Sequence, residues 1–509
     1  MPFLDWVNKN QAVQTSNDVP YHLLQHHKSY GDQDTAKDNL IIQGDNLQAL
    51  KALLPFYTGK VKCIFIDPPY NTQSAFEHYD DKLEHSQWLS MMYPRLVLLR
   101  DLLAEDGSIW VTLDDREAHY FKVLMDEVFT RNSFVANVVW QKRTSPDARI
   151  HLGSAHDNVI VYSKSNTQVK FNKLSITLDQ AKNYKNPDND PRGAWASTDF
   201  TAQGWRPNQM YEIATPDGTR YSPPDGRCWA NVESGFLKLQ QDGRLWFGKD
   251  GNARPRVKNY LSEGDGVSSW TWWVNSEVGH NQEAKKENNT LFGADDAFDT
   301  PKPERLIKRV LEIATDTNDL ILDSFLGSGT TAAVAHKMGR RYIGIEMGEH
   351  AVTHCIPRLE KVIDGEQGGI SKTVEWQGGG GFSFYTLGAP VFDSDGHITA
   401  DVRFKDLAAY IWWLETKTPT GSQATQSQSP FIGELNGVAY YLLYNGILGD
   451  RRPAGGNVLT SGVLAHLLET HPHTGKKVIF GEASRLGLAR LTTENIEFKQ
   501  IPYELHDRV

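Results

Sequence analysis

The sequence of 509 residues has little cysteine, no long apolar run and no recognisable targeting segment at its start. Its three cysteines, Cys63, Cys228 and Cys355, are far apart, which excludes a disulfide framework and a CxxC metal pair. No stretch of 18 apolar residues occurs, so no transmembrane helix is expected. The opening residues, MPFLDWVNKN, lack the basic and apolar segments of a secretory signal. These absences favour a protein of the reducing cytoplasm.

The sequence also lacks an excess of positive charge, since its formal net charge is −10. This sum argues weakly against nucleic acid as a partner, but a local basic surface is sufficient to bind phosphates. Two basic segments are present, WQKRTSPDARIHLG at residues 140–153 and GNARPRVKNY at 251–260. Nucleic acid therefore remains an allowed partner.

Hydrophobic patterning predicts alternating strands and helices in two regions of the chain. In the first region, strands are predicted at 39–45, 61–66, 108–115 and 134–140, and helices at 46–57, 85–107 and 116–129. Pro55 is expected to end the first of these helices, and Gly107 to cap the second. In the second region, strands are predicted at 319–325 and 340–346, and helices at 302–315 and 329–339. This alternation is typical of an open parallel α/β sheet.

Breaks in the alternation divide the chain into five segments. Between 166 and 299, Pro, Gly, Asn and Trp dominate and no long amphipathic helix is evident, so we expect an inserted, irregular, partly β domain. A glycine-rich stretch after residue 365 indicates a further boundary. The predicted segments are an N-terminal segment at 1–37, α/β halves at 38–165 and 300–365, the insert at 166–299, and a C-terminal domain at 366–509.

The motif Asp67-Pro68-Pro69-Tyr70 directly follows the predicted buried strand at 61–66. A strand stopped by a proline turn is the simpler interpretation. The alternative is a site for a flat ring that carries an amine, because Asp67 and the carbonyl of Pro68 can accept the two amine hydrogens and Tyr70 can stack on the ring. The prolines restrict the backbone, so the carbonyl is aimed before a substrate arrives.

A second candidate site lies in residues 320–331, where a predicted strand, a glycine turn and a helix follow one another. Gly327 and Gly329 allow a tight turn, and the helix start behind them offers N–H groups to a ligand. A Walker A loop is excluded, because Gly-Lys-Ser/Thr is absent here. Glu346 ends the next predicted strand, 19 residues after Gly327, where an acid suits the two hydroxyls of a ribose.

Other polar residues favour S-adenosylmethionine as the ligand of this second site. Asp323 and the hydroxyls of Thr330 and Thr331 suit a zwitterionic amino-acid tail, which this cofactor combines with a ribose and an adenine. Asp45, at the end of its own predicted strand, is placed to accept a hydrogen bond from the adenine amine. The structural alternatives are a helix N-cap for Asp45 and a surface acid for Glu346. The ligand site is favoured, because all these residues lie at one predicted sheet edge.

With these motifs in view, the chain resembles the adenine-specific DNA methyltransferases of the β arrangement. More narrowly, it resembles the modification (Mod) subunits of type III restriction-modification systems. In that family the Asp-Pro-Pro-Tyr motif comes first, a target-recognition domain follows and the glycine motif comes last, as here. The resemblance implies a Rossmann-like fold that depends on S-adenosylmethionine, with circularly ordered motifs, an inserted target-recognition domain at 166–299 and an α+β C-terminal domain.

The resemblance also assigns a role to each matching residue. The catalytic motif corresponds to Asp67, Pro68, Pro69 and Tyr70, the cofactor loop to Asp323, Phe325, Gly327 and Gly329, the ribose-binding acid to Glu346, and the contact with the cofactor's carboxylate to Lys302. No metal is implied, because the sulfonium methyl group is already electrophilic. Leu326 departs from the family, which usually has a small residue between Phe and Gly, so Leu326 is expected to need extra room.

The activity implied by the resemblance is methyl transfer to N6 of adenine at a specific sequence in duplex DNA, with the target base flipped out. The implied partners are double-stranded DNA, a second copy of the chain, and a restriction subunit with helicase and nuclease activity. The implied location is the cytoplasm. Two alternatives stay open, namely N4-cytosine methylation and a DNA-recognition subunit that mainly delivers the restriction enzyme to its site.

Overall fold

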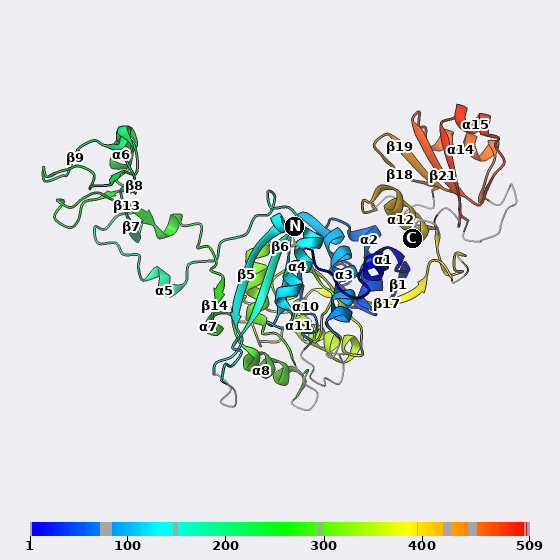
Figure 1. The fold of residues 1–509 in the computed structure, drawn as a ribbon, viewed down its shortest axis with the longest axis horizontal. Helices are drawn as coiled ribbons and strands as arrows, with labels where there is room; N and C mark the ends of the chain where they lie inside the picture. The colour runs from blue at the N-terminus through cyan, green and yellow to red at the C-terminus, as the bar shows by residue number, and fades with distance from the viewer. Residues whose placement is uncertain are drawn as a thin grey trace. The chain divides into compact units, whose positions relative to one another are not determined.

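The chain divides into two compact units, Met1–Phe171 with Trp270–Val509, and Asn172–Ser269 (Figure 1). The computed structural model describes residues 3–71, 84–145, 151–293, 298, 300–393, 395, 397–420, 429–445, 456–502 and 505. Among the helices in these ranges, none combines the length and apolar character needed to cross a membrane.

The first unit is built around a ten-stranded mixed sheet in the order β1-β17-β2-β16-β15-β3-β4-β6-β5-β14. From β17 to β4, neighbouring strands run parallel, whereas β1 and β6 run antiparallel to the strands beside them. The predicted α/β class is confirmed. The strands are β1 (His22–Gly31), β2 (Leu40–Gln43), β3 (Val61–Ile66), β4 (Leu103–Leu113), β5 (Phe134–Gln141), β6 (His156–Ser163), β14 (Trp272–Trp273), β15 (Leu320–Asp323), β16 (Arg341–Glu346) and β17 (Gly381–Pro390).

The central strands are continuously apolar because both faces of the sheet are covered. Ile64 and Ile66 pack with α2, α3 and α4 in one hydrophobic cluster. The alternate residues Cys63 and Phe65 point to the other face and are also fully buried. The helices of this region are α1 (Lys9–Asp18), α2 (Asn46–Tyr57), α3 (His85–Leu102), α4 (Ala118–Phe129), α7 (Asn275–Val278), α8 (Asn281–Phe292), α9 (Glu304–Ala314), α10 (Thr330–Lys337) and α11 (Ile356–Ile363).

The motifs are circularly ordered: two motifs that lie far apart along the chain belong to neighbouring strands of the sheet. Strand β3, which precedes the Asp67 motif, lies beside β15, which precedes the glycine turn, with Leu322 opposite Ile64. The residues of the second unit separate these two strands in the sequence. The two motifs predicted far apart in the chain therefore end neighbouring strands.

Two predicted helix ends are wrong. Pro55 lies inside α2, which continues to Tyr57, so this proline does not end the helix. Gly107 does not cap α3 but lies within β4, which pairs with β3 from Leu103 onward. A Cβ atom at Gly107 would lie 2.9 Å from the carbonyl oxygen of Val61, so the close approach of β3 requires the glycine.

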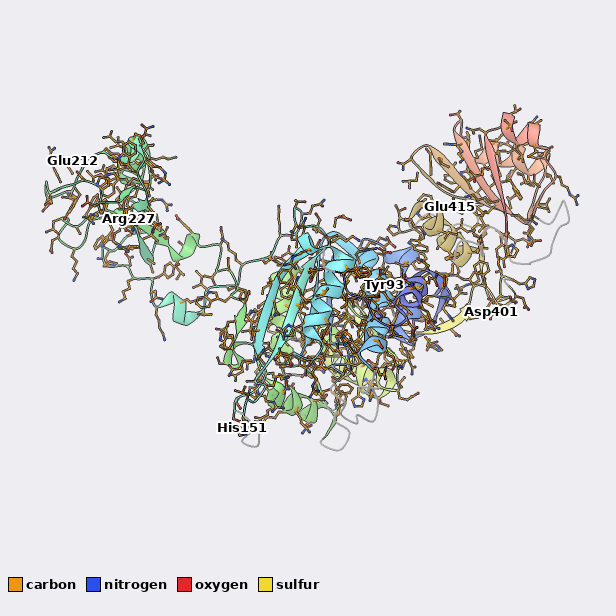
Figure 2. The ribbon with its side chains drawn as sticks, viewed as in Figure 1. Tyr93, His151, Glu212, Arg227, Asp401 and Glu415 are labelled. Carbon is orange, nitrogen blue, oxygen red and sulfur yellow. The ribbon has the colours of Figure 1, made fainter. Side chains whose placement is uncertain are left out.

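The main sheet extends past the boundary predicted at residue 366, because β17 pairs with β1 and β2. Beyond β17, a four-stranded sheet in the order β18-β19-β21-β23 combines with helices, an α+β composition as predicted. Glu415 of α12, labelled in Figure 2, forms an ion pair with Lys499 of β23 at 2.7 Å. The elements are α12 (Phe404–Thr416), β18 (Phe431–Leu435), β19 (Val438–Leu442), β20 (Val458–Leu459), α14 (Ser461–Thr470), β21 (Lys476–Gly481), β22 (Ala483–Ser484), α15 (Leu488–Thr493) and β23 (Ile496–Gln500).

The 172–269 unit is made of short strands and short helices around an aromatic cluster. The cluster contains Phe200, Ile213, Trp229, Phe236, Leu245 and Phe247. Helix α8, which lies within the predicted insert, belongs to the other unit. The elements are α5 (Leu178–Ala181), β7 (Trp195–Asp199), β8 (Thr201–Gln203), β9 (Ile213–Ala214), β10 (Arg220–Tyr221), β11 (Arg227–Trp229), α6 (Glu233–Gln241), β12 (Leu245–Trp246) and β13 (Arg256–Tyr260).

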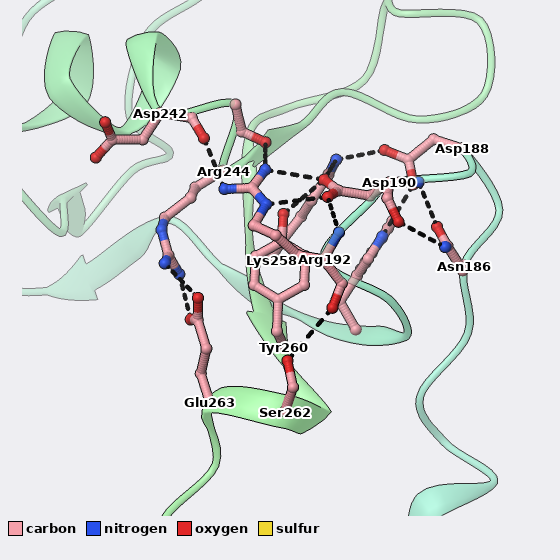
Figure 3. Close-up of polar contacts among 12 residues, drawn as sticks. Asn186, Asp188, Asp190, Arg192, Asp242, Arg244, Lys258, Tyr260, Ser262 and Glu263 are labelled. Atoms are coloured by element: carbon pink, nitrogen blue, oxygen red, sulfur yellow. Dashed lines mark hydrogen bonds and ion pairs between the residues drawn. The ribbon is translucent and has the colours of Figure 1, made fainter.

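A polar network around Asp190 supports this small unit (Figure 3). The carboxylate accepts hydrogen bonds from Arg192 at 2.9 Å, Lys258 at 3.0 Å and the Tyr260 hydroxyl at 2.6 Å. The bonds from Arg192 first, and those from Tyr260 and Lys258, hold the pKa of Asp190 well below its usual value. The unit has few long helices or strands. A carboxylate that accepts several hydrogen bonds therefore stabilises its loops, as a regular sheet does in a larger domain.

Candidate active site

The predicted site residues gather at the carboxyl edge of the parallel strands. Asp67 follows β3, Asp323 ends β15 and Glu346 ends β16, and these strands are neighbours. A cavity of about 1360 Å³ lies along this edge. Of the predicted residues, it is lined by Asp67, Pro68, Pro69, Tyr70, Lys302, Asp323, Phe325, Gly327, Thr330, Thr331 and Glu346. The volume exceeds the range of about 300–1,000 Å³ usual for one small ligand, so there is room for two.

Asp67 is held by side chains from two other elements. The Thr112 hydroxyl of β4 donates to its Oδ1 at 2.5 Å, and Lys302, which precedes α9, forms an ion pair with its Oδ2. The ammonium of Lys302 also lies 5.1 Å from the centre of the Tyr70 ring. The carboxylate is therefore fixed in direction, and Lys302 contacts two residues of the Asp67–Tyr70 motif.

The rest of the Asp67 motif is anchored by buried residues. Trp88 of α3 donates its indole N–H to the Pro69 carbonyl at 2.7 Å. The Tyr70 hydroxyl donates to Oδ2 of Asp157 at 3.4 Å. Burial first, with the charges of Asp157 and Asp67, raises the pKa of Tyr70 well above its usual value, so its hydroxyl stays protonated.

The glycine turn is built on two buried carboxylates. Glu346 accepts the backbone N–H of Gly327 at 2.7 Å, while Asp323 accepts the N–H of Phe325 at 2.9 Å and the Thr331 hydroxyl at 2.6 Å. Burial raises the pKa of Asp323 to about 7. The turn is thus fixed from the ends of β15 and β16.

Both glycines of the turn have backbone conformations that other residues rarely adopt. Gly327 has a φ of 57° and Gly329 a φ of 83°. Leu326 finds its room against β16, since a Cβ atom at Gly344 would lie 2.5 Å from the Leu326 side chain. The departure from the resembled family at Leu326 is therefore accommodated by a glycine on the neighbouring strand.

A buried charge network lies behind the turn. Arg358 of α11 donates to the Thr330 hydroxyl at 2.8 Å and to Glu304 at 3.0 Å. Glu304 also pairs with Lys337 at 2.8 Å, and these three charged residues are buried. The Thr330 hydroxyl is therefore engaged with Arg358, although the residue borders the cavity.

Two of the predicted residues do not line the cavity. Gly329 does not border it, and a Cβ atom at this position would lie 3.2 Å from the Cα atom of Cys355. Asp45 caps α2 by accepting the N–H groups of Leu47 at 2.9 Å and Gln48 at 3.2 Å, and it pairs with Arg95 at 3.3 Å. The cap is the structural alternative that the sequence offered for Asp45. A contact of Asp45 with a cofactor adenine stays a prediction.

A family model described as DNA methylase matches residues 61–356, more than half of the chain. The chain belongs to the DNA methylase family. It is 33% identical over 412 residues to the probable type III restriction-modification enzyme HindVI Mod subunit of Haemophilus influenzae, which covers 69% of this chain and 54% of that protein.

The StyLTI Mod subunit of Salmonella typhimurium is 36% identical to this chain over 372 residues, which covers 65% of this chain and 55% of that protein. The predicted resemblance to Mod subunits is confirmed, and the chain spans about half the length of these two relatives. Among solved structures, PvuII cytosine-N4-specific DNA methyltransferase covers 66% of this chain and 90% of its own, with 16% identity and a TM-score of 0.37.

Several residues around the methylase cavity were missed in the sequence. Thr112 lies near the carboxyl end of the strand predicted at 108–115, where a polar side chain was a usable signal. Lys142 was visible only as part of a basic segment. Asp157, Trp88 and Arg358 had no local signal, because their roles depend on contacts with elements far away in the chain.

Proposed function

We propose that this methylase transfers a methyl group from S-adenosylmethionine to N6 of adenine at a specific sequence in duplex DNA. The observation that carries the proposal is the single cavity that contains both the Asp67–Tyr70 motif and the Asp323–Glu346 region. Its size suits a cofactor and a flipped base together. The family membership and the similarity to Mod subunits support the same activity.

The β15 and β16 side of the cavity fits S-adenosylmethionine. Glu346 is a buried carboxylate of the kind that binds ribose hydroxyls, and Lys302 supplies a positive charge for the cofactor's carboxylate. At Gly327 a Cβ atom would lie 3.3 Å from the Phe298 ring, so only glycine leaves this space open. When bound, the cofactor supplies an electrophilic methyl group.

The Asp67 motif supplies the acceptors for the amine of the target base. Asp67 accepts one N6 hydrogen and the Pro68 carbonyl accepts the other, which frees the nitrogen lone pair for attack. As the N–C bond forms and the S–C bond breaks, N6 loses one proton toward Asp67. Thr112 and Lys302 keep the Asp67 carboxylate aimed, which is preorganisation of the kind that lowers a barrier.

The proposal extends to the partners of the methylase. The 172–269 unit, within the predicted recognition segment 166–299, reads the DNA sequence, and exchanging it for that of a related methylase should change the methylated sequence. Two copies of the chain act together, and a restriction subunit joins them in the cytoplasm. Light scattering of the full-length chain tests the pair, and a monomer that methylates duplex DNA at full rate would contradict it.

A methylation assay tests the reaction itself. Duplex DNA is incubated with the methylase and labelled S-adenosylmethionine, and its nucleosides are then separated by mass spectrometry. N6-methyladenine is expected with the natural chain and not with the Asp67→Ala variant. N4-methylcytosine as the product would replace the proposed target. DNA binding without methylation would instead favour a subunit that only recognises DNA.

A further inference from the structure

On the side of Tyr70, the cavity contains a buried carboxylate besides Asp67. Asp157 is 1% exposed, and its Oδ1 forms an ion pair with Lys142. Its Oδ2 accepts the hydrogen bond from the Tyr70 hydroxyl at 3.4 Å. Lys142, Asp157 and Tyr70 all line the cavity. The aromatic ring of the catalytic motif is therefore tied to a buried ion pair.

The topology explains how these residues meet. Lys142 directly follows β5, and Asp157 is the second residue of β6. Because β6 runs antiparallel to β4, its first residues lie beside the last residues of β4, with Asn158 opposite Leu113. The start of β6 is thus brought to the same sheet edge as the end of β3.

We propose that Asp157 and Lys142 are positioning residues for the methyl transfer. Asp157 holds the Tyr70 hydroxyl, and with it the ring face on which the target base stacks. Lys142 balances the charge of Asp157. This inference rests on the proposed function and adds two residues to its site.

The charge balance matters because Lys302 interacts with both carboxylates. Burial raises the pKa of Asp157, although the charges of Lys142 and then Lys302 oppose this effect. Lys302 is also the ion-pair partner of Asp67. Without Lys142, Asp157 would compete with Asp67 for Lys302, and the direction of the catalytic carboxylate would change.

A similar lysine–aspartate–tyrosine group between α4 and β6 provides a control, although Arg131 adds a second cation at 2.9 Å from its carboxylate. Lys122 of α4 pairs with Asp126 at 2.8 Å, and the Tyr162 hydroxyl donates to Asp126 at 2.6 Å. Tyr162 lies opposite Ile109 in β4, away from the carboxyl edge, and none of the three residues lines the cavity. This group has the chemistry of a stabilising network without access to substrate.

Asp126 and Asp157 also differ in how far their neighbours offset the cost of burying a negative charge. Burial by itself would raise the pKa of Asp126, but hydrogen bonds from Lys122 and Tyr162 outweigh it and the pKa is lowered. The pKa of Asp157 is instead raised. A buried carboxylate that is incompletely compensated inside a cavity is characteristic of functional sites.

The test compares kcat and KM for the full-length natural methylase and its Asp157→Asn, Tyr70→Phe and Asp126→Asn variants, with duplex DNA and S-adenosylmethionine. We expect Asp157→Asn and Tyr70→Phe each to lower kcat by about tenfold to a hundredfold, the cost of a misplaced reacting group. The KM for the cofactor should change little. Combining the two changes should lower kcat no further. Asp126→Asn should lower the unfolding temperature and leave kcat unchanged.

Any one of four outcomes would overturn the proposal. One is a natural kcat in Asp157→Asn, and another is independent, multiplicative losses in the double variant. The third is recovery of the natural kcat when Lys142→Met is combined with Asp157→Leu, which would show a purely structural ion pair. If Asp157→Asn does not fold, Tyr70→Phe removes the same hydrogen bond, and an unchanged kcat there also overturns the proposal. A natural chain that methylates no adenine would instead overturn the proposed function and this inference together.

Discussion

The two sides of the cavity, which we propose bind the cofactor and the target base, hold their carboxylates in different ways. On the cofactor side, Glu346 and Asp323 accept hydrogen bonds from backbone N–H groups of the glycine turn. On the target side, Asp67 and Asp157 are held by hydroxyl and ammonium groups of side chains. Any substitution except one to proline leaves a backbone N–H donor in place, whereas a side-chain donor is removed by many single substitutions. Substitutions on the target side should therefore change the rate of the reaction separately from cofactor binding.

The largest expected effect separates the two sides directly. Asp67→Ala should lower kcat by about 10²–10⁴-fold, because the amine loses its proton acceptor. The dissociation constant for S-adenosylmethionine should stay nearly unchanged, since Asp67 faces the target side. Calorimetric titration measures it alongside kcat. Strong loss of cofactor binding in this variant would contradict the division into two sides.

The network behind the glycine turn should decide the stability of the cofactor side. Arg358→Met removes one of the two cations that pair with the buried Glu304 and should cost about 3–5 kcal/mol in the free energy of unfolding. Thermal unfolding with and without S-adenosylmethionine measures the loss. Arg358→Lys keeps the charge and is the control. Equal stability of the Met variant and the natural chain would show that the network contributes nothing.

Glu346→Ala is the counterpart of Asp67→Ala on the cofactor side. We expect it to weaken binding of S-adenosylmethionine by about 1.5–3 kcal/mol, the contribution of a hydrogen bond to a charged group. At saturating cofactor, kcat should recover much of its natural value. Titration and saturation kinetics on the same preparation give both quantities. Natural affinity in this variant would remove Glu346 from the ribose site.

Thr112→Val should have a smaller effect, confined to the target side. The variant loses the 2.5 Å hydrogen bond to Asp67 while keeping the shape of the side chain. We expect kcat to fall by about tenfold, which corresponds to about 1.4 kcal/mol. Thr112→Ser keeps a hydroxyl and should retain most of the rate. A Val variant as active as the Ser variant would show that Lys302 alone orients Asp67.

A further expected effect concerns pH and the cofactor side. Burial raises the pKa of Asp323 to about 7, above the value of about 3.9 in an unfolded chain. The folded state therefore binds more protons between these values, and stability falls as the pH rises through this window. Relative to Asp323→Asn, which does not titrate, the natural chain should gain stability as the pH falls from 8 to 5. Thermal unfolding across this range measures the difference, and a constant difference would contradict the raised pKa.

The sequence by itself determined the local features of this protein. The apolar run before Asp67 predicts a strand buried on both faces, and an acid after such a run must lie at a sheet edge. The same reasoning located Asp323 and Glu346, which the structure places around one cavity. These predictions succeed because strand periodicity and chain reversal depend on neighbouring residues.

The tertiary structure alone decided which distant residues meet at that edge. Pairing of β4 with β3 placed Gly107 in a strand instead of a helix cap. The antiparallel direction of β6 brought Asp157 to Tyr70, and the docking of α11 put Arg358 behind Thr330. Strand order and packing depend on the whole set of buried surfaces, so no local pattern contains these contacts. The sequence therefore determined the motifs, and the packing of the sheet determined the residues that hold them.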